Sequence, residues 1–208
     1  MVVRAVRLRD ADATRRRVLD SAEALFAQKG IDGVRLREIA DRAKVTVPLL
    51  CHHFGDKEAL YTAVIDRTME RFAALGWGVL RAAGSFRERL DAMVSGLIDL
   101  LASDPIATNL LHRELVDGGT RALPIAERWF VPLKDAASAE IRLGQSRGEV
   151  RAELDPELLV LHIVGAAMYP SVAAPIVRVV WGADPLAGAL LERRKRELSE
   201  LLGRLVTP

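Results

Sequence analysis

The stretch that decides the fold is residues 35–54, RLREIADRAKVTVPLLCHHF. Its first half places Leu36, Ile39, Ala40 and Ala43 at intervals of three and four, which predicts a short helix over 35–43 with one apolar face. Its second half begins at Thr46, a natural N-cap, and has a proline in the first turn, where a missing N–H costs nothing. We therefore expect a second short helix over 46–54, separated from the first by a tight turn.

The residues on either side extend this pattern. Upstream, an apolar face made by Val18, Leu19, Ala22, Leu25 and Phe26 predicts a helix over 13–29, starting at a cap on Asp12 or Thr14 and stopped by Gly30. Downstream, Gly55-Asp56 breaks the chain before a longer helix over 57–77. Three short helices with a tight turn between the last two are typical of a helix-turn-helix, whose last helix fits the DNA major groove.

The remainder of the chain is also helical by pattern. Alternating strand-type runs are nearly absent, and capping signals such as Ser85-x-x-Glu88 recur. Further helices are expected over 85–103, 105–117, 124–144, 156–174 and 185–205. The fold class is therefore all-α: an N-terminal helix-turn-helix DNA-binding domain over 1–60, with residues 1–11 as a flexible basic arm, and a C-terminal helical ligand-binding and dimerisation domain over 61–208.

Composition narrows the class of protein. Half of the 208 residues are hydrophobic and 28% are charged, which allows a substantial core. The net charge is only +2, but residues 1–60 hold twelve Lys and Arg against nine Asp and Glu, so the excess lies at the DNA-binding end. A single cysteine excludes a disulfide framework within the chain and fits a reducing cytoplasm. We find no signal peptide and no run long and apolar enough for a membrane span, so no membrane partner is expected.

The segment 14–67 resembles the DNA-binding domain of the TetR family of transcriptional regulators, most of which are repressors. The matching residues are Thr14, Val18-Leu19, Ala22, Leu25-Phe26, Gly30, Arg37-Glu38-Ile39-Ala40, Ala43, Val45-Thr46, His52-His53-Phe54, Lys57-Glu58-Ala59-Leu60 and Tyr61. The resemblance covers about the first third of the chain, and the order of helices behind it is similar to the family's ligand-binding and dimerisation domain.

This resemblance implies roles by position. The third helix would read operator DNA, with Thr46, Val47, Leu49 and His52 at or near the DNA surface. Lys57, at the start of the fourth helix, would contact a phosphate with help from the helix dipole. Arg35 and Arg37 would touch the DNA backbone or the edge of the groove, and Phe54 would hold the third helix to the core.

Four positions depart from the family pattern. Lys44 stands where glycine is common in the turn, so either a left-handed lysine is mildly strained there or the turn differs from the family's. Arg35 replaces the usual Ser or Thr cap, Pro48 and Leu49 replace small residues, and Cys51 replaces a common phosphate-contacting tyrosine. The reading helix therefore offers few polar groups, and we expect more apolar contact with thymine methyl groups or a larger share for the arginines and the N-terminal arm.

The C-terminal half carries a prediction of dimerisation. The helix over 156–174 has small residues at 165–167, and the last helix carries a wide leucine stripe. Two such helices from each of two subunits would form an intersubunit four-helix bundle, although both helices could instead fill the core of one chain. The interface candidates are Leu159, Ile163, Ala166, Leu190, Leu191, Leu198 and Leu201.

A pocket for a small-molecule effector is expected between the fourth and eighth helices. Its candidate residues mix apolar walls with few polar anchors, as small-molecule sites do, and favour an apolar or aromatic effector. They are Trp77, Met93, Leu97, Leu111, His112, Leu115, Trp129, Phe130, His162, Met168 and Tyr169.

Other classes of function have little support. No P-loop, dinucleotide-binding glycine motif, nucleophile elbow or metal-ligand motif occurs, so we expect neither an enzyme nor a cofactor. The adjacent Cys51, His52 and His53 point about 100° apart on a helix and cannot share one metal ion. One alternative stays open, a helical ligand-binding or scaffold protein with a weakened DNA-binding head. Whether a regulator would repress or activate is also open.

Overall fold

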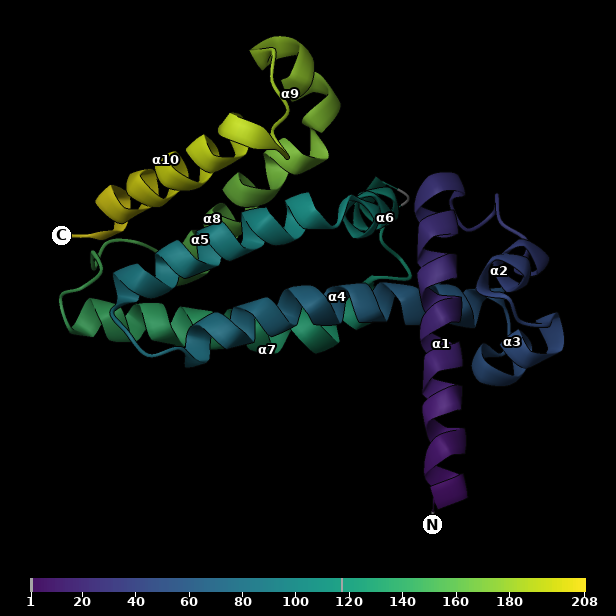
Figure 1. The fold of residues 1–208 in the computed structure, drawn as a ribbon. Coiled ribbons are helices and arrows are strands. Elements are labelled where there is room, and N and C mark those ends of the chain that lie inside the picture. The colour runs from purple at the N-terminus through teal and green to yellow at the C-terminus, as the bar shows by residue number, and fades with distance from the viewer. Residues whose placement is uncertain (1, 117) are drawn as a thin grey trace. The chain divides into compact units, whose positions relative to one another are not determined.

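The computed structural model describes residues 2–116 and 118–208, and within them it is built of helices with no strand. In chain order these helices are α1 Val2–Lys29, α2 Leu36–Ala43, α3 Val47–Phe54, α4 Lys57–Arg81, α5 Phe86–Ser103, α6 Pro105–Val116, α7 Leu123–Ser146, α8 Pro156–Val172, α9 Ala174–Trp181 and α10 Gly188–Val206 (Figure 1). The all-α prediction is therefore confirmed for the described residues.

The chain divides into two compact units. The first, which we call the head, comprises Met1–Thr68 and Asn109–Ile125, and the second, which we call the body, comprises Met69–Thr108 and Ala126–Pro208. The predicted boundary after residue 60 thus lies close to the observed one at Thr68. The sequence did not predict that the second half of α6 and the loop after it belong to the head.

The core of the head is formed by the apolar faces that define its helices. Val18, Phe26, Ile39, Leu50 and Leu60 are buried to 0% exposure, and they bring α1, α2, α3 and the start of α4 together. Figure 1 shows α2 and α3 beside α1. The four helices bury one continuous set of side chains, so α3 is held by packing rather than by its own helix propensity, which is small for eight residues.

The first helix begins earlier than the sequence indicated. Residues 2–11, predicted to be a flexible arm, belong to α1, and neither Asp12 nor Thr14 caps a helix start. The physical reason is that nothing between Val2 and Lys29 interrupts a helix, because the segment contains neither glycine nor proline. The stop at Gly30 is as predicted, with a left-handed φ of 71° and an N–H that donates to Phe26 at 2.8 Å.

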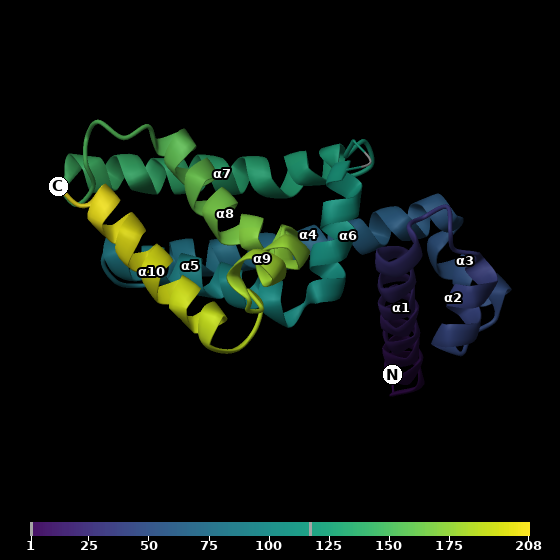
Figure 2. The same ribbon diagram turned by 90° about the horizontal axis from the view of Figure 1, so that it is seen from above.

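The body packs around one apolar cluster. Leu90, Val94 and Ile98 of α5 lie against Leu159 and Ile163 of α8, and residues of α7 and α10 complete the cluster. Figure 2 shows α10 and α8 lying across α5. The guanidinium of Arg87 from α5 lies against Gly203 of α10, in the space that a Cβ would take. α5, α7, α8 and α10 therefore form the core of the body.

The sequence missed α9 and misplaced the start of α10. α9 is eight residues long, has no side-chain cap and follows α8 after a bend of 75°. In the sequence, only the proline near its start indicates that a new helix begins. Asp184 does accept the N–H of Leu186 at 2.9 Å, but α10 begins later, at Gly188. Among the described residues no single helix is long and apolar enough to cross a membrane, and α8 with α9 would reach the length only as a bent pair.

Candidate DNA-binding and effector-binding sites

The turn between α2 and α3 has a left-handed lysine, which is one of the two alternatives that the sequence left open. Lys44 adopts φ 56° and ψ 48°, the left-handed conformation usual for glycine, and its N–H bonds to Asp41 O at 3.2 Å. Val45 N–H then bonds to Ala40 O at 3.0 Å, which closes the end of α2. The chain reverses within two residues, so α3 is set at a fixed angle to α2, as in a helix-turn-helix.

α3 begins at the predicted cap and presents one face to solvent. Thr46 Oγ1 accepts the Leu49 N–H at 3.3 Å, and Leu50 and Phe54 anchor the opposite face in the head core. The Arg15 guanidinium lies over the Phe54 ring at 4.6 Å and closes that side. Thr46, Leu49 and His52 are exposed on the outer side, whereas Val47, also predicted to read DNA, is half-buried and lies on the same side as Leu50 and Phe54.

The cations that flank α3 differ in their surroundings. Arg35 and Arg37 are both exposed, and Arg35 gives α2 no side-chain cap. Lys57 is half-buried, and its Nζ donates to Val34 O at 3.4 Å, which ties the start of α4 to the turn before α2. Lys57 keeps two other N–H groups, since an ammonium has three donors, so a phosphate contact is compatible with this position.

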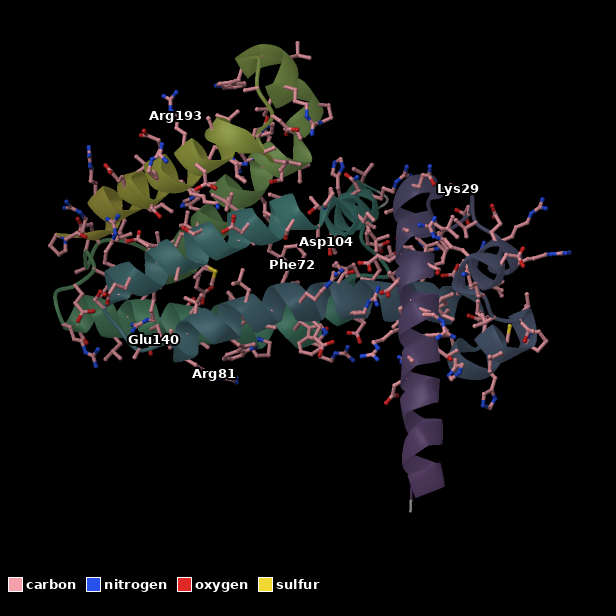
Figure 3. All side chains as sticks on the ribbon, in the orientation of Figure 1. Lys29, Phe72, Arg81, Asp104, Glu140 and Arg193 are labelled. Atoms are coloured by element: carbon pink, nitrogen blue, oxygen red, sulfur yellow. The ribbon has the colours of Figure 1, made fainter. Side chains whose placement is uncertain are left out.

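Glu38 organises the start of α2 in place of the missing cap. Its carboxylate accepts the Arg35 N–H at 2.8 Å and the Lys29 ammonium at 2.7 Å (Lys29 is labelled in Figure 3). The bond from Lys29, followed by the bond from the Arg35 backbone, lowers the pKa of the Glu38 carboxyl below its usual value. The bond from the Arg35 N–H to Glu38 is one half of a capping box, and it offsets in part the absence of a Ser or Thr cap at position 35.

A buried carboxylate joins α6 to α4 inside the head. Glu114 is 2% exposed, and its Oε1 accepts the N–H groups of Arg121 and Ala122, each at 3.1 Å. Its Oε2 accepts the Tyr61 hydroxyl at 2.8 Å. The Tyr61 ring in turn packs edge-on against Phe26 of α1 at 5.0 Å. This network fixes the end of α6 and the following loop to two helices of the DNA-binding head.

Two arginines from the same segment extend the attachment. Arg113 donates to the carbonyls of Ala27 and Gln28, both at 2.9 Å, and so satisfies the open end of α1. Arg121 pairs with Glu58 at 2.9 Å. Sequence reasoning missed these residues because their partners are more than 60 positions away along the chain, and no local pattern reports such pairs.

One cavity of the body is an apolar chamber between α4, α5, α7 and α8. Its volume is about 90 Å³, and the residues that line it are Val79, Leu80, Phe86, Arg89, Leu90, Met93, Ala137, Glu140, Ile141, Val160, Ile163 and Val164. Arg89 and Glu140 are the charged residues of this lining, and they pair with each other at 3.1 Å. A second, open groove of about 560 Å³ runs past Arg71, Leu75, Leu100, Ala102 and Leu191.

The predicted pocket residues are dispersed rather than gathered. Met93 is the one that lines the chamber, whereas Leu97 is buried in the body core. His162 and Tyr169 are exposed on α8, and the remaining half-buried residues of the body line neither cavity: Trp77, Trp129, Phe130 and Met168. Leu111 and His112 are half-buried in the head, and the side chain of Leu115 lies outside the described residues. Bulky side chains were chosen from the sequence, but the chamber is lined largely by aliphatic residues.

The predicted dimer face needs a correction on α8. Leu159 and Ile163 point into the body core, at 3% and 7% exposure, so they cannot form an interface. Leu190, Leu191 and Leu198 are half-buried, and Leu201 is 64% exposed. The exposed side of α8 is instead the row Leu158, Leu161, His162, Gly165, Ala166 and Tyr169. α8 is apolar on all sides, so periodicity could not tell its inner face from its outer one.

A tight-turn pair of helices with an exposed reading face, carried on a helical body, defines a helix-turn-helix DNA-binding protein. Comparison with known families makes this more specific. The model for bacterial regulatory proteins of the tetR family matches residues 18–64, and the model for the tetracyclin repressor-like C-terminal domain matches residues 86–202. The chain belongs to the TetR family of transcriptional regulators.

Individual relatives agree with this assignment. The chain is 29% identical to the HTH-type transcriptional repressor SCO4008 of Streptomyces coelicolor, over 94% of this chain and 98% of that protein. It is 28% identical to the HTH-type transcriptional regulator RutR of Escherichia coli, over 85% and 82% of the two chains. A crystal structure of FadR from Bacillus subtilis in complex with stearoyl-CoA shares the fold, with a TM-score of 0.73 at 18% identity and coverage of 91% and 97%.

Proposed function

We propose that the chain is a ligand-responsive repressor that binds operator DNA as a homodimer and releases it when a small apolar or aromatic molecule enters the body. The observation that carries the proposal is the outer face of α3, where Thr46, Leu49 and His52 are exposed while Leu50 and Phe54 hold the helix to the core. An α-helix anchored in this way can enter a major groove with its outer side chains toward the base edges.

The chemistry of that face sets how DNA would be read. Leu49 is 39% exposed and can contact a thymine methyl group, while Thr46 and His52 supply the polar contacts. Arg35 and Arg37 carry fixed positive charge beside the face and would bind phosphates, which adds affinity but no sequence information. Specificity would therefore rest on few base contacts in each head, so two heads would be needed to recognise an operator.

The second head would come from a second copy of the chain. The exposed row on α8, with Leu161 and Tyr169 at 63% and 68% exposure, is a contiguous apolar side with small residues at its centre. α9 adds exposed apolar side chains, of which Val179 is 83% exposed. Apolar surface of this extent is typical of protein interfaces. A two-fold dimer would present two α3 helices to successive major grooves, about 34 Å apart.

The head network suggests how an effector would act. α6 is one continuous helix whose first residues belong to the body and whose last residues belong to the head. At the head end, Arg113 binds the terminus of α1 and Glu114 binds Tyr61 of α4. A ligand that binds more tightly to a state in which α6 is displaced would move both attachments. The ratio of its affinities for the displaced and undisplaced states limits how far it can lower operator affinity.

A gel shift in graded salt on the DNA that flanks the gene tests the DNA-binding proposal. Arg35→Ala and Arg37→Ala should each weaken binding to all sequences and reduce the salt slope by about one. Leu49→Ala should instead reduce the difference in affinity between operator DNA and scrambled duplex DNA. Arg204→Ala is the control, since Arg204 is an exposed arginine of the body that pairs with Glu200. Equal retardation of operator and scrambled DNA by the unaltered protein would refute the proposal.

The dimer proposal has its own test. Leu161→Asp places a charge on the exposed row of α8 and should convert the protein from dimer to monomer in sedimentation equilibrium. Leu123→Asp is the matched control, because Leu123 is equally exposed, at 62%, but lies in the head. This interface would be excluded if the unaltered protein sediments as a monomer, or if the Leu161→Asp variant still sediments as a dimer.

One observation favours a second candidate. Pro48 and Leu49 make the outer face of α3 unusually apolar for a DNA-reading helix, as expected of a ligand-binding or scaffold protein with a weakened head. That candidate predicts ligand binding without specific retardation of any DNA, so the same gel shift separates the two.

A further inference from the structure

The chamber of the body carries one charged pair in an otherwise apolar wall. Arg89 Nη2 donates to Glu140 Oε2 at 3.1 Å, and Arg89 Nη1 donates to Gly84 O at 2.7 Å (Glu140 is labelled in Figure 3). The rest of the wall is aliphatic or aromatic and includes Phe86 and Met93. A charged pair in such a wall is a candidate for the polar anchor that orients a bound molecule.

The two partners are not equivalent. The Arg89 side chain is 17% exposed and also bonds to a backbone carbonyl, whereas that of Glu140 is 37% exposed and pairs with Arg89. Glu140, the more exposed partner, can therefore turn toward water, while Arg89 is the less exposed partner and keeps its second bond, to Gly84 O. An arginine left with no anion in a mostly buried position would lose its charge-assisted bond. The carboxylate of a ligand can thus replace that of Glu140 while the Arg89 guanidinium stays in place.

From this asymmetry we infer that the effector is a small apolar monocarboxylate whose carboxylate replaces Glu140 on Arg89 while its apolar part fills the chamber. The inference rests on the proposed function and specifies its ligand. A cationic ligand would bind Glu140 and leave Arg89 without an anion, and a neutral one would have to leave the pair intact and fit in the remaining space.

The size of the chamber limits the ligand. A cavity of about 90 Å³ is smaller than one of roughly 150 Å³ that holds benzene in another protein, so the chamber has to widen before it can hold even a small ligand. Met93 is unbranched and adaptable and can widen the space by changing rotamer. A six-carbon chain with its carboxylate at the mouth would need this widening, and longer chains would need more.

Three probes with the same chain and different heads test the inference: sodium hexanoate, 1-hexanol and hexylamine. We expect isothermal calorimetry on the full chain to show hexanoate binding about tenfold or more tighter than the alcohol or the amine, since a charge-assisted bond is gained only by the acid. Arg89→Gln should abolish this preference. Glu140→Gln should strengthen hexanoate binding, by up to about fivefold, because the competing carboxylate is removed. Arg142→Gln, an exposed arginine on the same helix, should change nothing.

Two further variants locate the site. Ala137 lines the chamber and Ala102 lines the open groove, so Ala137→Leu should block hexanoate and Ala102→Leu should not. Equal affinity for the three probes, tighter binding of the amine, weaker hexanoate binding in Glu140→Gln or no hexanoate binding in the millimolar range would each overturn the inference. The titrations contain no DNA, so they can fail while specific operator retardation still stands.

Discussion

Replacing Glu114 tests whether the end of α6 is a structural part of the DNA-binding head. In Glu114→Ala two backbone N–H groups and the Tyr61 hydroxyl lose a buried charged acceptor. Each buried donor left unsatisfied costs about 1–3 kcal/mol, and water entering the space recovers part of that. We expect the free energy of unfolding to fall by about 4 kcal/mol.

Milder changes in the same network should lower the free energy of unfolding by less, and their effects should not be additive. Glu114→Gln keeps the shape and one acceptor oxygen, so about 1–2 kcal/mol is expected. Tyr61→Phe removes a single bond to a charged group and should cost about 2 kcal/mol. Because the two residues share one hydrogen bond, the double variant should cost about 1 kcal/mol less than the sum of the single ones.

Urea unfolding of the purified chain measures these differences, and operator affinity should fall in the same order. Glu127→Ala, an exposed glutamate in α7, is the control and should stay within about 0.5 kcal/mol of the unaltered protein. A loss below about 1 kcal/mol for Glu114→Ala, or strict additivity in the double variant, would show that the network does not hold α6 to the head.

Three further predictions concern the helix-turn-helix. Lys44→Gly should raise the free energy of unfolding by about 0.5–1 kcal/mol in thermal or urea melts, because glycine adopts a left-handed φ without strain; an equal gain in Lys44→Ala would assign the effect to charge instead. Thr46→Ala should lower it by about 1 kcal/mol through loss of the α3 cap, and Thr46→Ser should restore it. Glu38 has a lowered pKa in the folded state, so its contribution is present above its usual pKa and is lost as the pH falls through the folded-state value. A stability difference between the unaltered protein and Glu38→Gln should therefore exist at neutral pH and shrink in acid, and a difference independent of pH would contradict the assignment.

The sequence predicted those parts of the molecule that depend on neighbours along the chain. The cap at Thr46, the stop at Gly30 and the capping box at Ser85 and Glu88 are all found as expected, and Lys44 takes the left-handed one of the two alternatives left open for it. Each is a contact between residues at most four positions apart, or a property of a single residue, so local sequence contains the information that determines it.

The remainder depends on contacts between distant residues, and sequence reasoning failed there. Leu159 and Ile163 were assigned to a dimer face because α8 is apolar on every side, and only the packed body shows which side is inner. The sequence did not predict the role of Glu114 in the head, since a glutamate in a helix is usually solvent-exposed. Of the residues predicted for the effector pocket, Met93 lines the chamber, whose walls are mainly aliphatic residues of α4, α5, α7 and α8.

Selection from a random library of DNA duplexes measures the central claim most directly, because it needs no knowledge of the operator. The purified chain should enrich a palindromic sequence whose half-site centres are about one helical turn apart, and a variant with Leu49 and His52 both changed to alanine should not enrich it. A library that stays random after repeated rounds, or one enriched equally by the variant, would contradict the account of α3 as the reading helix of a dimeric regulator.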